Sequence, residues 1–144
     1  MRVDRKVQIK APPEDLYEVV MNPRCLGEWV TIQQFLEDAP DGQLTKGSTL
    51  TQCLKLAGRS FKVRWTVVEN ERAKRVVWEG RGPVRSKAKV IYEFDADGDT
   101  TTFFYANEYD LPGGVLGRMA GPMVKKVTAG ELDESLKRLK ALVE

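Results

Sequence analysis

The side chains available for chemistry in this 144-residue chain are limited by one absence, because the sequence contains no histidine. Serine–histidine and cysteine–histidine catalysis, histidine metal sites and the commonest general base near neutral pH are therefore excluded. A catalyst built from this chain would use carboxylates, lysine, tyrosine or bound water. Tyr92 and Tyr105 are the candidate phenols. Glu108 and Asp110 are the candidate carboxylates, although strand alternation points both of them outward.

The two cysteines, Cys25 and Cys53, have no metal-ligand spacing. A single pair of cysteines in a chain with no secretory signal is usually a pair of thiols. We therefore expect neither a metal ion nor a cofactor.

Charge and hydropathy narrow the possible partners. Lys and Arg number 23 against 21 Asp and Glu, and the two signs are interspersed. The basic clusters "KVRW" and "RSKAK" alternate with other residues, so they are interpreted as solvated outer faces of strands, and no nucleic-acid partner is expected. No apolar run approaches the roughly 20 residues of a membrane span, and the N-terminus has no signal-type segment. We expect a single domain over 1–144, located in the cytoplasm, and the sequence carries no signal of oligomeric state.

The first third of the chain predicts one strand, two short helices and a second strand. Residues 2–10 alternate apolar and polar side chains, as a half-buried strand does. Pro12 and Pro13 end that strand, and Pro13 suits the first turn of a helix that stops at Asn22-Pro23. A second short helix over about 23–28 leads to Trp29, and residues 30–37 are a plausible strand.

The middle of the chain predicts five more strands joined by short connections. Asp97-Gly98 in "DADGD" is the strongest turn signal, since this pair tolerates positive φ at little cost. Short connections imply antiparallel neighbours. The expected strands are 48–57, 59–70, 74–80, 84–95 and 100–111.

The C-terminal residues 122–143 predict one long helix, because apolar residues recur there at three- and four-residue steps. Residues 112–121 are either a lid-like loop or the first turns of the same helix, and Gly121-Pro122 favours the loop. The predicted fold is therefore α+β. It is a curved seven-stranded antiparallel sheet with two short helices after strand 1, wrapped around a long C-terminal helix.

Strand alternation assigns a set of side chains to the inner face of this sheet. It includes two of the three tryptophans, which form large flat apolar walls. A filled hydrophobic core is one reading of this face, and a ligand cavity is the other. The inward polar side chains of Gln52, Ser86 and Asn107 suit a solid core poorly, so each would meet a ligand or an internal polar network. The inner-face site candidates are Gln52, Leu54, Trp65, Trp78, Ser86, Val90, Tyr92, Tyr105 and Asn107.

The order of elements and several local stretches resemble the superfamily of START lipid-transfer domains, polyketide cyclases and the birch-pollen allergen. The stretches are "VQIKAPPEDLYEVVMNP", Trp29, "GRSFKVRWTVVE", "DADGDTTTFFYANEYDLPGG" and "LDESLKRLKALVE". The bacterial polyketide cyclase/dehydrase branch is the most similar one. The resemblance implies a helix-grip fold with a deep cavity between the sheet and the C-terminal helix.

The resemblance also bears on the site. It implies that Trp29 lies at the end of the cavity, beneath the short helices. Met119, Met123 and Val127 are added as candidates on the helical side, where methionine supplies adaptable apolar surface. Aromatase/cyclase members use an inward arginine and a serine on the strand that corresponds to 61–68. Here Trp65 and Val67 occupy those positions, and the neighbouring Arg64 points outward.

These observations favour a protein that binds or carries a hydrophobic small molecule of lipid, polyketide or aromatic type. One alternative is an enzyme similar to polyketide cyclases and dehydratases, which the missing arginine and the absence of histidine argue against. The other is a protein-interaction module, similar to the chaperone-stimulating or toxin-like relatives of this superfamily, which would present an outer apolar patch instead of an open cavity.

Overall fold

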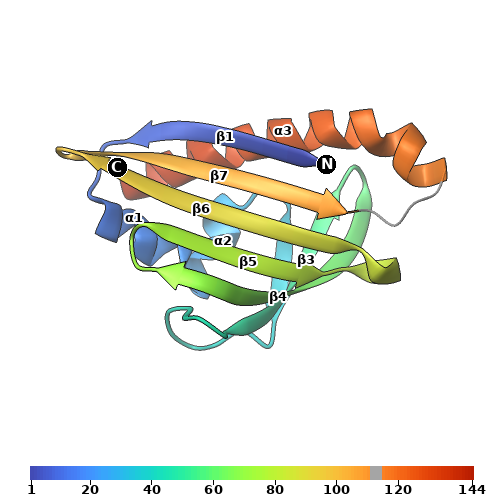
Figure 1. Ribbon diagram of the computed structural model, residues 1–144, viewed down its shortest axis with the longest axis horizontal. Coiled ribbons are helices and arrows are strands. Elements are labelled where there is room, and N and C mark those ends of the chain that lie inside the picture. Colours follow the sequence, from blue (N-terminus) through green and yellow to red (C-terminus); the bar gives the residue numbers. More distant parts are fainter. Residues whose placement is uncertain (111–114) are drawn as a thin grey trace.

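The computed structural model describes residues 1–110 and 115–144, with side chains for 1–109 and 122–144. Its seven strands form one antiparallel sheet in the order β1-β7-β6-β5-β4-β3-β2 (Figure 1). The predicted α+β architecture is confirmed. The strands are β1 (Arg2–Ile9), β2 (Gln33–Glu37), β3 (Thr49–Leu56), β4 (Arg59–Glu71), β5 (Arg75–Arg81), β6 (Lys87–Asp97) and β7 (Thr100–Asp110).

In the described part of the chain, three α-helices lie on the inner face of this sheet. α1 (Pro13–Val20) and α2 (Pro23–Trp29) fill one end, and α3 (Val115–Val143) runs along the edge strand β1 (Figure 1). Each short helix has a proline in its first turn, and the Asn22 side chain accepts a hydrogen bond from the Arg24 backbone N–H to cap α2. No helix among the described residues is long and apolar enough to cross a membrane.

The long helix starts earlier than the sequence predicted. Residues 115–121, expected to be part of a loop, belong to α3, and Pro122 lies inside the helix. Proline removes one backbone donor without necessarily ending a helix, and the apolar stripe beyond it packs on the sheet. Thr128, Leu132, Leu136 and Leu139 on that stripe are all buried. Residues 111–114 of the predicted loop lie outside the described part of the chain.

The start of β6 also differs from the expectation. The sequence predicted a strand from residue 84, but Pro83–Arg85 form a 3₁₀ turn, η1, and β6 begins at Lys87. The Ser86 hydroxyl donates to the Pro83 carbonyl at 2.7 Å, and the Gly82 N–H donates to the Ser86 carbonyl at 3.0 Å. Proline has no N–H for the sheet ladder, so the chain closes a local turn there instead. Ser86 is therefore a turn residue and not a strand residue.

The outer face of the sheet carries a small apolar cluster made of Val77, Ile91 and Ala106, with Val68 and Phe104 packed against it. The three central residues are buried, and the Arg2 guanidinium lies 5.7 Å from the centre of the Phe104 ring. This cluster is covered, so it does not form the exposed patch that an interaction module would present.

Gly80 allows the inner face to be aromatic. It lies directly opposite Trp65 in the β4–β5 ladder, and a Cβ built on it would come within 2.6 Å of Val63 Cγ1 and 2.7 Å of Trp65 Cε3. Real Cβ atoms do not approach other atoms so closely. Only glycine leaves room for the Trp65 indole at this distance from β5.

Gly80→Ala should therefore lower the free energy of unfolding by about 1–3 kcal/mol, the usual cost of overpacking a filled site. Urea denaturation followed by tryptophan fluorescence would measure it. Gly42→Ala is the matched control, because nothing lies within 4 Å of the position where its Cβ would be. A Gly80 variant as stable as the Gly42 variant would contradict the packing described here.

Candidate functional site

A cavity of about 770 Å³ lies between the inner face of the sheet and α3. Its walls come from β3–β7, α2 and the segment after it, η1, and the inner side of α3. The lining is mainly apolar and includes the aromatic residues Phe61, Trp65, Trp78, Tyr92, Tyr105 and Tyr109. A cavity of this size and lining is typical of small-molecule sites.

All nine inner-face site candidates from strand alternation line this cavity. They are Gln52, Leu54, Trp65, Trp78, Ser86, Val90, Tyr92, Tyr105 and Asn107. Phe61 and Val63, for which strand alternation favoured core packing, also lie in its wall.

The helical candidates lie elsewhere. Trp29 is fully buried behind the wall, with its ring centre 5.6 Å from that of Tyr105 and 6.1 Å from that of Tyr92. Met123 is 68% exposed and Val127 is half-buried, and neither lines the cavity, because helical periodicity turns the neighbouring Val124 and Thr128 toward it. The Met119 side chain lies outside the described residues.

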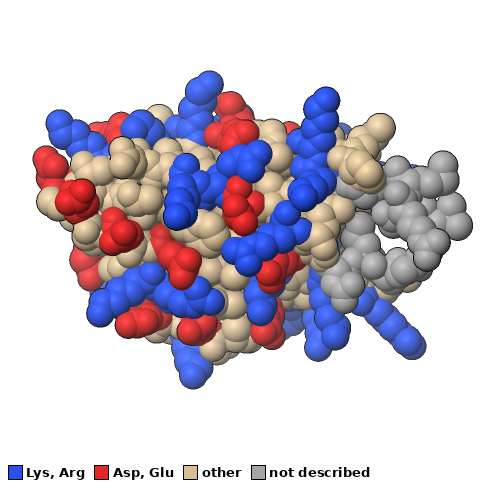
Figure 2. Space-filling model, turned by 45° about the horizontal axis from the view of Figure 1, so that its top comes forward, with Lys and Arg blue, Asp and Glu red and all other residues tan. Residues whose placement is uncertain are grey.

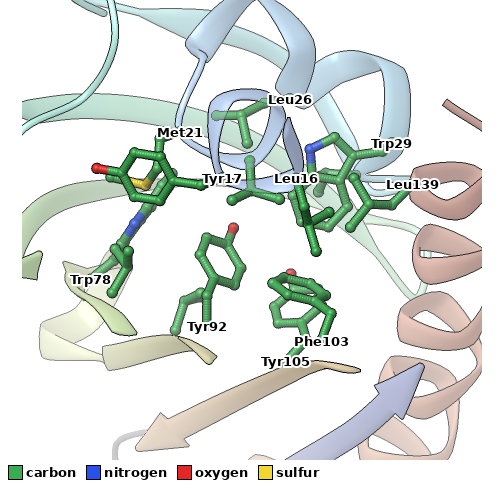
Figure 3. Close-up of a cluster of buried hydrophobic side chains, with 14 of the residues drawn as sticks. Leu16, Tyr17, Met21, Leu26, Trp29, Trp78, Tyr92, Phe103, Tyr105 and Leu139 are labelled. Carbon is green, nitrogen blue, oxygen red and sulfur yellow. The ribbon is translucent and has the colours of Figure 1, made fainter. Parts of the chain in front are cut away.

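Figure 3 shows the aromatic base of the site. Tyr92 and Tyr105 project from the sheet toward α1 and α2, and Trp29 and Leu16 face them from the helical side. The ring centres of Tyr92 and Tyr105 are 5.3 Å apart in an edge-to-face arrangement. Edge-to-face contacts between aromatic rings add stability beyond the area that they bury. The aromatic base is therefore closely packed, and it closes this end of the interior.

Several lining residues were missed by sequence reasoning. The side of α3 contributes Val124, Thr128, Glu131, Leu132 and Ser135. Their spacing, in steps of three and four, was visible, but the same spacing is expected of a helix that packs into a core. Alternation places Tyr109 on the strand face of Tyr105 and Asn107, although it was not among the site candidates.

A polar network fixes Trp65 in the wall. The indole Nε1–H of Trp65 donates to Gln52 Oε1 at 3.0 Å, and Gln52 Nε2 donates to Gln33 Oε1 at 2.8 Å. For Gln52 the structure therefore supports the internal network. By contrast, the Trp78 Nε1–H and the Thr128 hydroxyl are buried without a partner among the described residues.

Glu131 supplies a carboxylate to the cavity wall, the only one among the described lining residues. The Thr31 hydroxyl donates a short hydrogen bond to Glu131 Oε2 and lies 3.2 Å from Ser135 Oγ, which in turn accepts from the Thr31 N–H at 3.1 Å. These bonds tie the segment after α2 to α3. They also orient the carboxylate beside the apolar space.

The phenols in the cavity are neutral at physiological pH. Burial raises the pKa of Tyr92 well above its usual value, and the nearby Tyr105 adds to the rise. Burial also raises the pKa of Tyr105, which the adjacent Asn107 side chain partly offsets. For Tyr109, burial again raises the pKa, Tyr105 adds to the rise, and the nearby Thr128 hydroxyl, which has no hydrogen-bond partner among the described residues, offsets part of it. These groups can donate hydrogen bonds but are poor bases.

The other described side chains considered for chemistry do not line the cavity. Burial and the nearby Glu28 carboxylate raise the pKa of the Cys25 thiol, and both cysteines are free. Arg64 is exposed on the outer face, as predicted. Glu108 also lies on the outer face, in an ion pair with Arg2 at 3.4 Å. Within the described part of the chain, no cluster of acidic or cysteine side chains could hold a metal ion.

The exposed lining residues mark the opening of the cavity. Arg59 and Ser60 come from the β3–β4 hairpin, and Val84 and Lys87 come from η1 and the start of β6. Val84 is 80% exposed, and both Val84 and Arg85 have positive φ. A β-branched residue seldom adopts that conformation. The opening thus combines two cations with an exposed apolar side chain.

Residues 1–144 match the family model described as polyketide cyclase / dehydrase and lipid transport. The chain belongs to this family. Comparison with curated proteins gives no significant match. Among solved structures, a protein of Thermus thermophilus is similar with a TM-score of 0.84 and 18% identity, over 99% of this chain and 97% of that one.

Two further structures connect the fold to the predicted superfamily. A START superfamily protein of Mycobacterium smegmatis has a TM-score of 0.71 and 18% identity, over 99% of this chain and 96% of its own. The Zhui aromatase/cyclase of Streptomyces has a TM-score of 0.77 and 13% identity, over 99% of this chain and 93% of its own. At such identities the likeness shows the fold alone. Together with the family match, it confirms the resemblance found in the sequence.

The shifted phenols predict how stability depends on pH. An unfolded tyrosine ionises near pH 10, whereas these three in the folded protein do so only at higher pH. Below pH 10 the folded and the unfolded protein both keep the phenol protons, so the phenols add no pH dependence to the free energy of unfolding. Above pH 10 the unfolded state loses them first, and stability falls by up to about 1.4 kcal/mol per pH unit for each group.

Urea midpoints measured between pH 8 and pH 11, with phenolate absorbance at 295 nm, would show this fall. Tyr109→Phe should make the slope shallower. Full ionisation of all tyrosines in the folded protein near pH 10 would contradict the burial.

Proposed function

We propose that the protein binds a hydrophobic small molecule in the cavity between the sheet and α3. The observation that supports this proposal is an apolar, aromatic-lined space of about 770 Å³ whose opening is bordered by exposed side chains. A space of this size left empty would forgo the dispersion contacts that stabilise a packed core. An apolar ligand would restore these contacts.

The distribution of polar groups suggests the shape of the ligand. The interior presents neutral phenols and the Asn107 amide, whereas Arg59 and Lys87 stand at the opening. A molecule with an apolar body and a polar or anionic end near the opening would match both regions. Lipid-like, polyketide and aromatic compounds all include such molecules.

An enzyme similar to polyketide cyclases is the second candidate, and one observation favours it. Glu131 places a carboxylate in the wall, and hydrogen bonds from Thr31 fix its orientation. The tyrosines are neutral and the arginine of the aromatase/cyclase strand is replaced here, so this carboxylate has no evident catalytic partner among the described lining residues. Binding without chemistry is therefore the better-supported function.

Filling the cavity should abolish binding without unfolding the protein. Thr128→Phe directs a large apolar side chain from α3 into the space and removes a buried hydroxyl that has no partner among the described residues. We expect the affinity for the neutral fluorescent probe N-phenyl-1-naphthylamine to fall at least tenfold, with the melting temperature unchanged or higher.

Lys137→Phe is the control on the same helix, because Lys137 is exposed and does not line the cavity. It should bind the probe as the parent protein does. Equal binding by parent and Thr128→Phe, or no binding of any hydrophobic compound by the parent, would overturn the proposal.

A further inference from the structure

The outer face of the sheet carries two adjacent rows of charged side chains. The charges alternate in sign along the first row, whereas three neighbouring residues of the second row are all positive. In the first row, Arg2, Glu108, Lys89 and Glu79 lie directly opposite one another on β1, β7, β6 and β5. Cross-strand neighbours of opposite charge stabilise a sheet, so this row has an ordinary structural explanation.

The second row breaks that rule. Lys87 on β6, Arg81 on β5 and Arg64 on β4 lie directly opposite one another, and all three are exposed. Like charges in this position destabilise a sheet. Among the described side chains, no ion pair joins Arg64 or Arg81 to a carboxylate. The β7 member of the row is Asp110, opposite Lys87, so the argument rests on the arginines.

The two rows border one groove of about 780 Å³ on the outer face of the sheet, and its lining shares Lys87, Ala88 and Tyr109 with that of the ligand cavity on the inner face. The described side chains of the groove include five cations, Arg2, Arg64, Arg81, Lys87 and Lys89, against the two carboxylates of Glu79 and Glu108, a difference of +3. The protein as a whole has a net charge of only +2.

The hydrogen bonds of Arg64 point toward β3, away from the rest of its row. The Arg64 guanidinium donates to Thr51 Oγ1 at 3.3 Å and to Thr49 Oγ1 at 3.4 Å, both on β3 and on the far side of Arg64 from β5. Gly80 and Ala88 lie opposite each other between the two rows, and they also line the groove. Figure 2 shows both signs scattered over the adjoining side of the molecule, with Lys and Arg denser toward the end that borders the grey residues.

We propose that this groove binds a small multivalent anion that carries linked phosphate groups. Strands lie about 4.8 Å apart, so three cations on adjacent strands span about 10 Å, which two or three linked phosphates would match. Arginine forms paired hydrogen bonds to phosphate oxygens, and a bound anion turns the repulsion within the row into attraction. The row is too short to track a nucleic-acid backbone.

The test is binding of inorganic pyrophosphate at constant ionic strength, followed by calorimetry and by the melting temperature. We expect the parent protein to be stabilised, and Arg81→Gln and Arg64→Gln each to bind at least about tenfold more weakly. Without anion, both variants should be as stable as the parent or more stable, because a like charge has been removed. Arg81→Lys should retain part of the affinity.

Lys89→Gln is the matched control, because Lys89 borders the same groove but lies between two carboxylates. It should keep most of the affinity. Stabilisation by sodium chloride at equal ionic strength, or equal pyrophosphate binding by parent and Arg81→Gln, would overturn the proposal. So would binding of poly-glutamate or of phosphatidylglycerol vesicles in the absence of pyrophosphate binding. Thr128→Phe should leave pyrophosphate binding intact, which separates this site from the cavity.

Discussion

The concave face of a seven-stranded sheet is wider than a single helix can cover. In this protein α3 packs along β1 and against α2, while β3, β4 and β5 curve away from it. The two short helices and the aromatic base close one end of the concave face, where Trp29, Tyr92 and Phe103 are fully or almost fully buried. The remaining width becomes the cavity. Its existence therefore follows from the architecture, whereas its chemistry follows from the side chains that face it.

Gly80 and Gln52 then determine the shape of one wall of the cavity. Gly80 removes the side chain that would lift Trp65 from the sheet, and Gln52 holds the indole by its N–H. On the opposite wall, the bonds from Thr31 to Glu131 and Ser135 fix α3 relative to the segment after α2. The two walls are held separately, so the space between them does not depend on a ligand to keep it open.

Much of the fold and of the cavity wall could be predicted from the sequence. Period-two alternation predicted the inner faces of β3, β4 and β7 correctly, because a half-buried strand leaves a strong pattern. The pattern failed where local backbone chemistry took over. Pro83 converted the expected start of β6 into a turn around Ser86, and Pro122 proved compatible with a continuous helix. The contribution of α3 to the wall was hidden, since an apolar helical stripe looks the same whether it faces a core or a cavity.

Xenon under pressure tests the central claim most directly, because it enters apolar cavities and scatters X-rays strongly. A crystal structure of the pressurised protein should show xenon between the sheet and α3, in contact with Trp65 and Leu132. An interior filled by side chains, with no xenon at that position, would contradict the account.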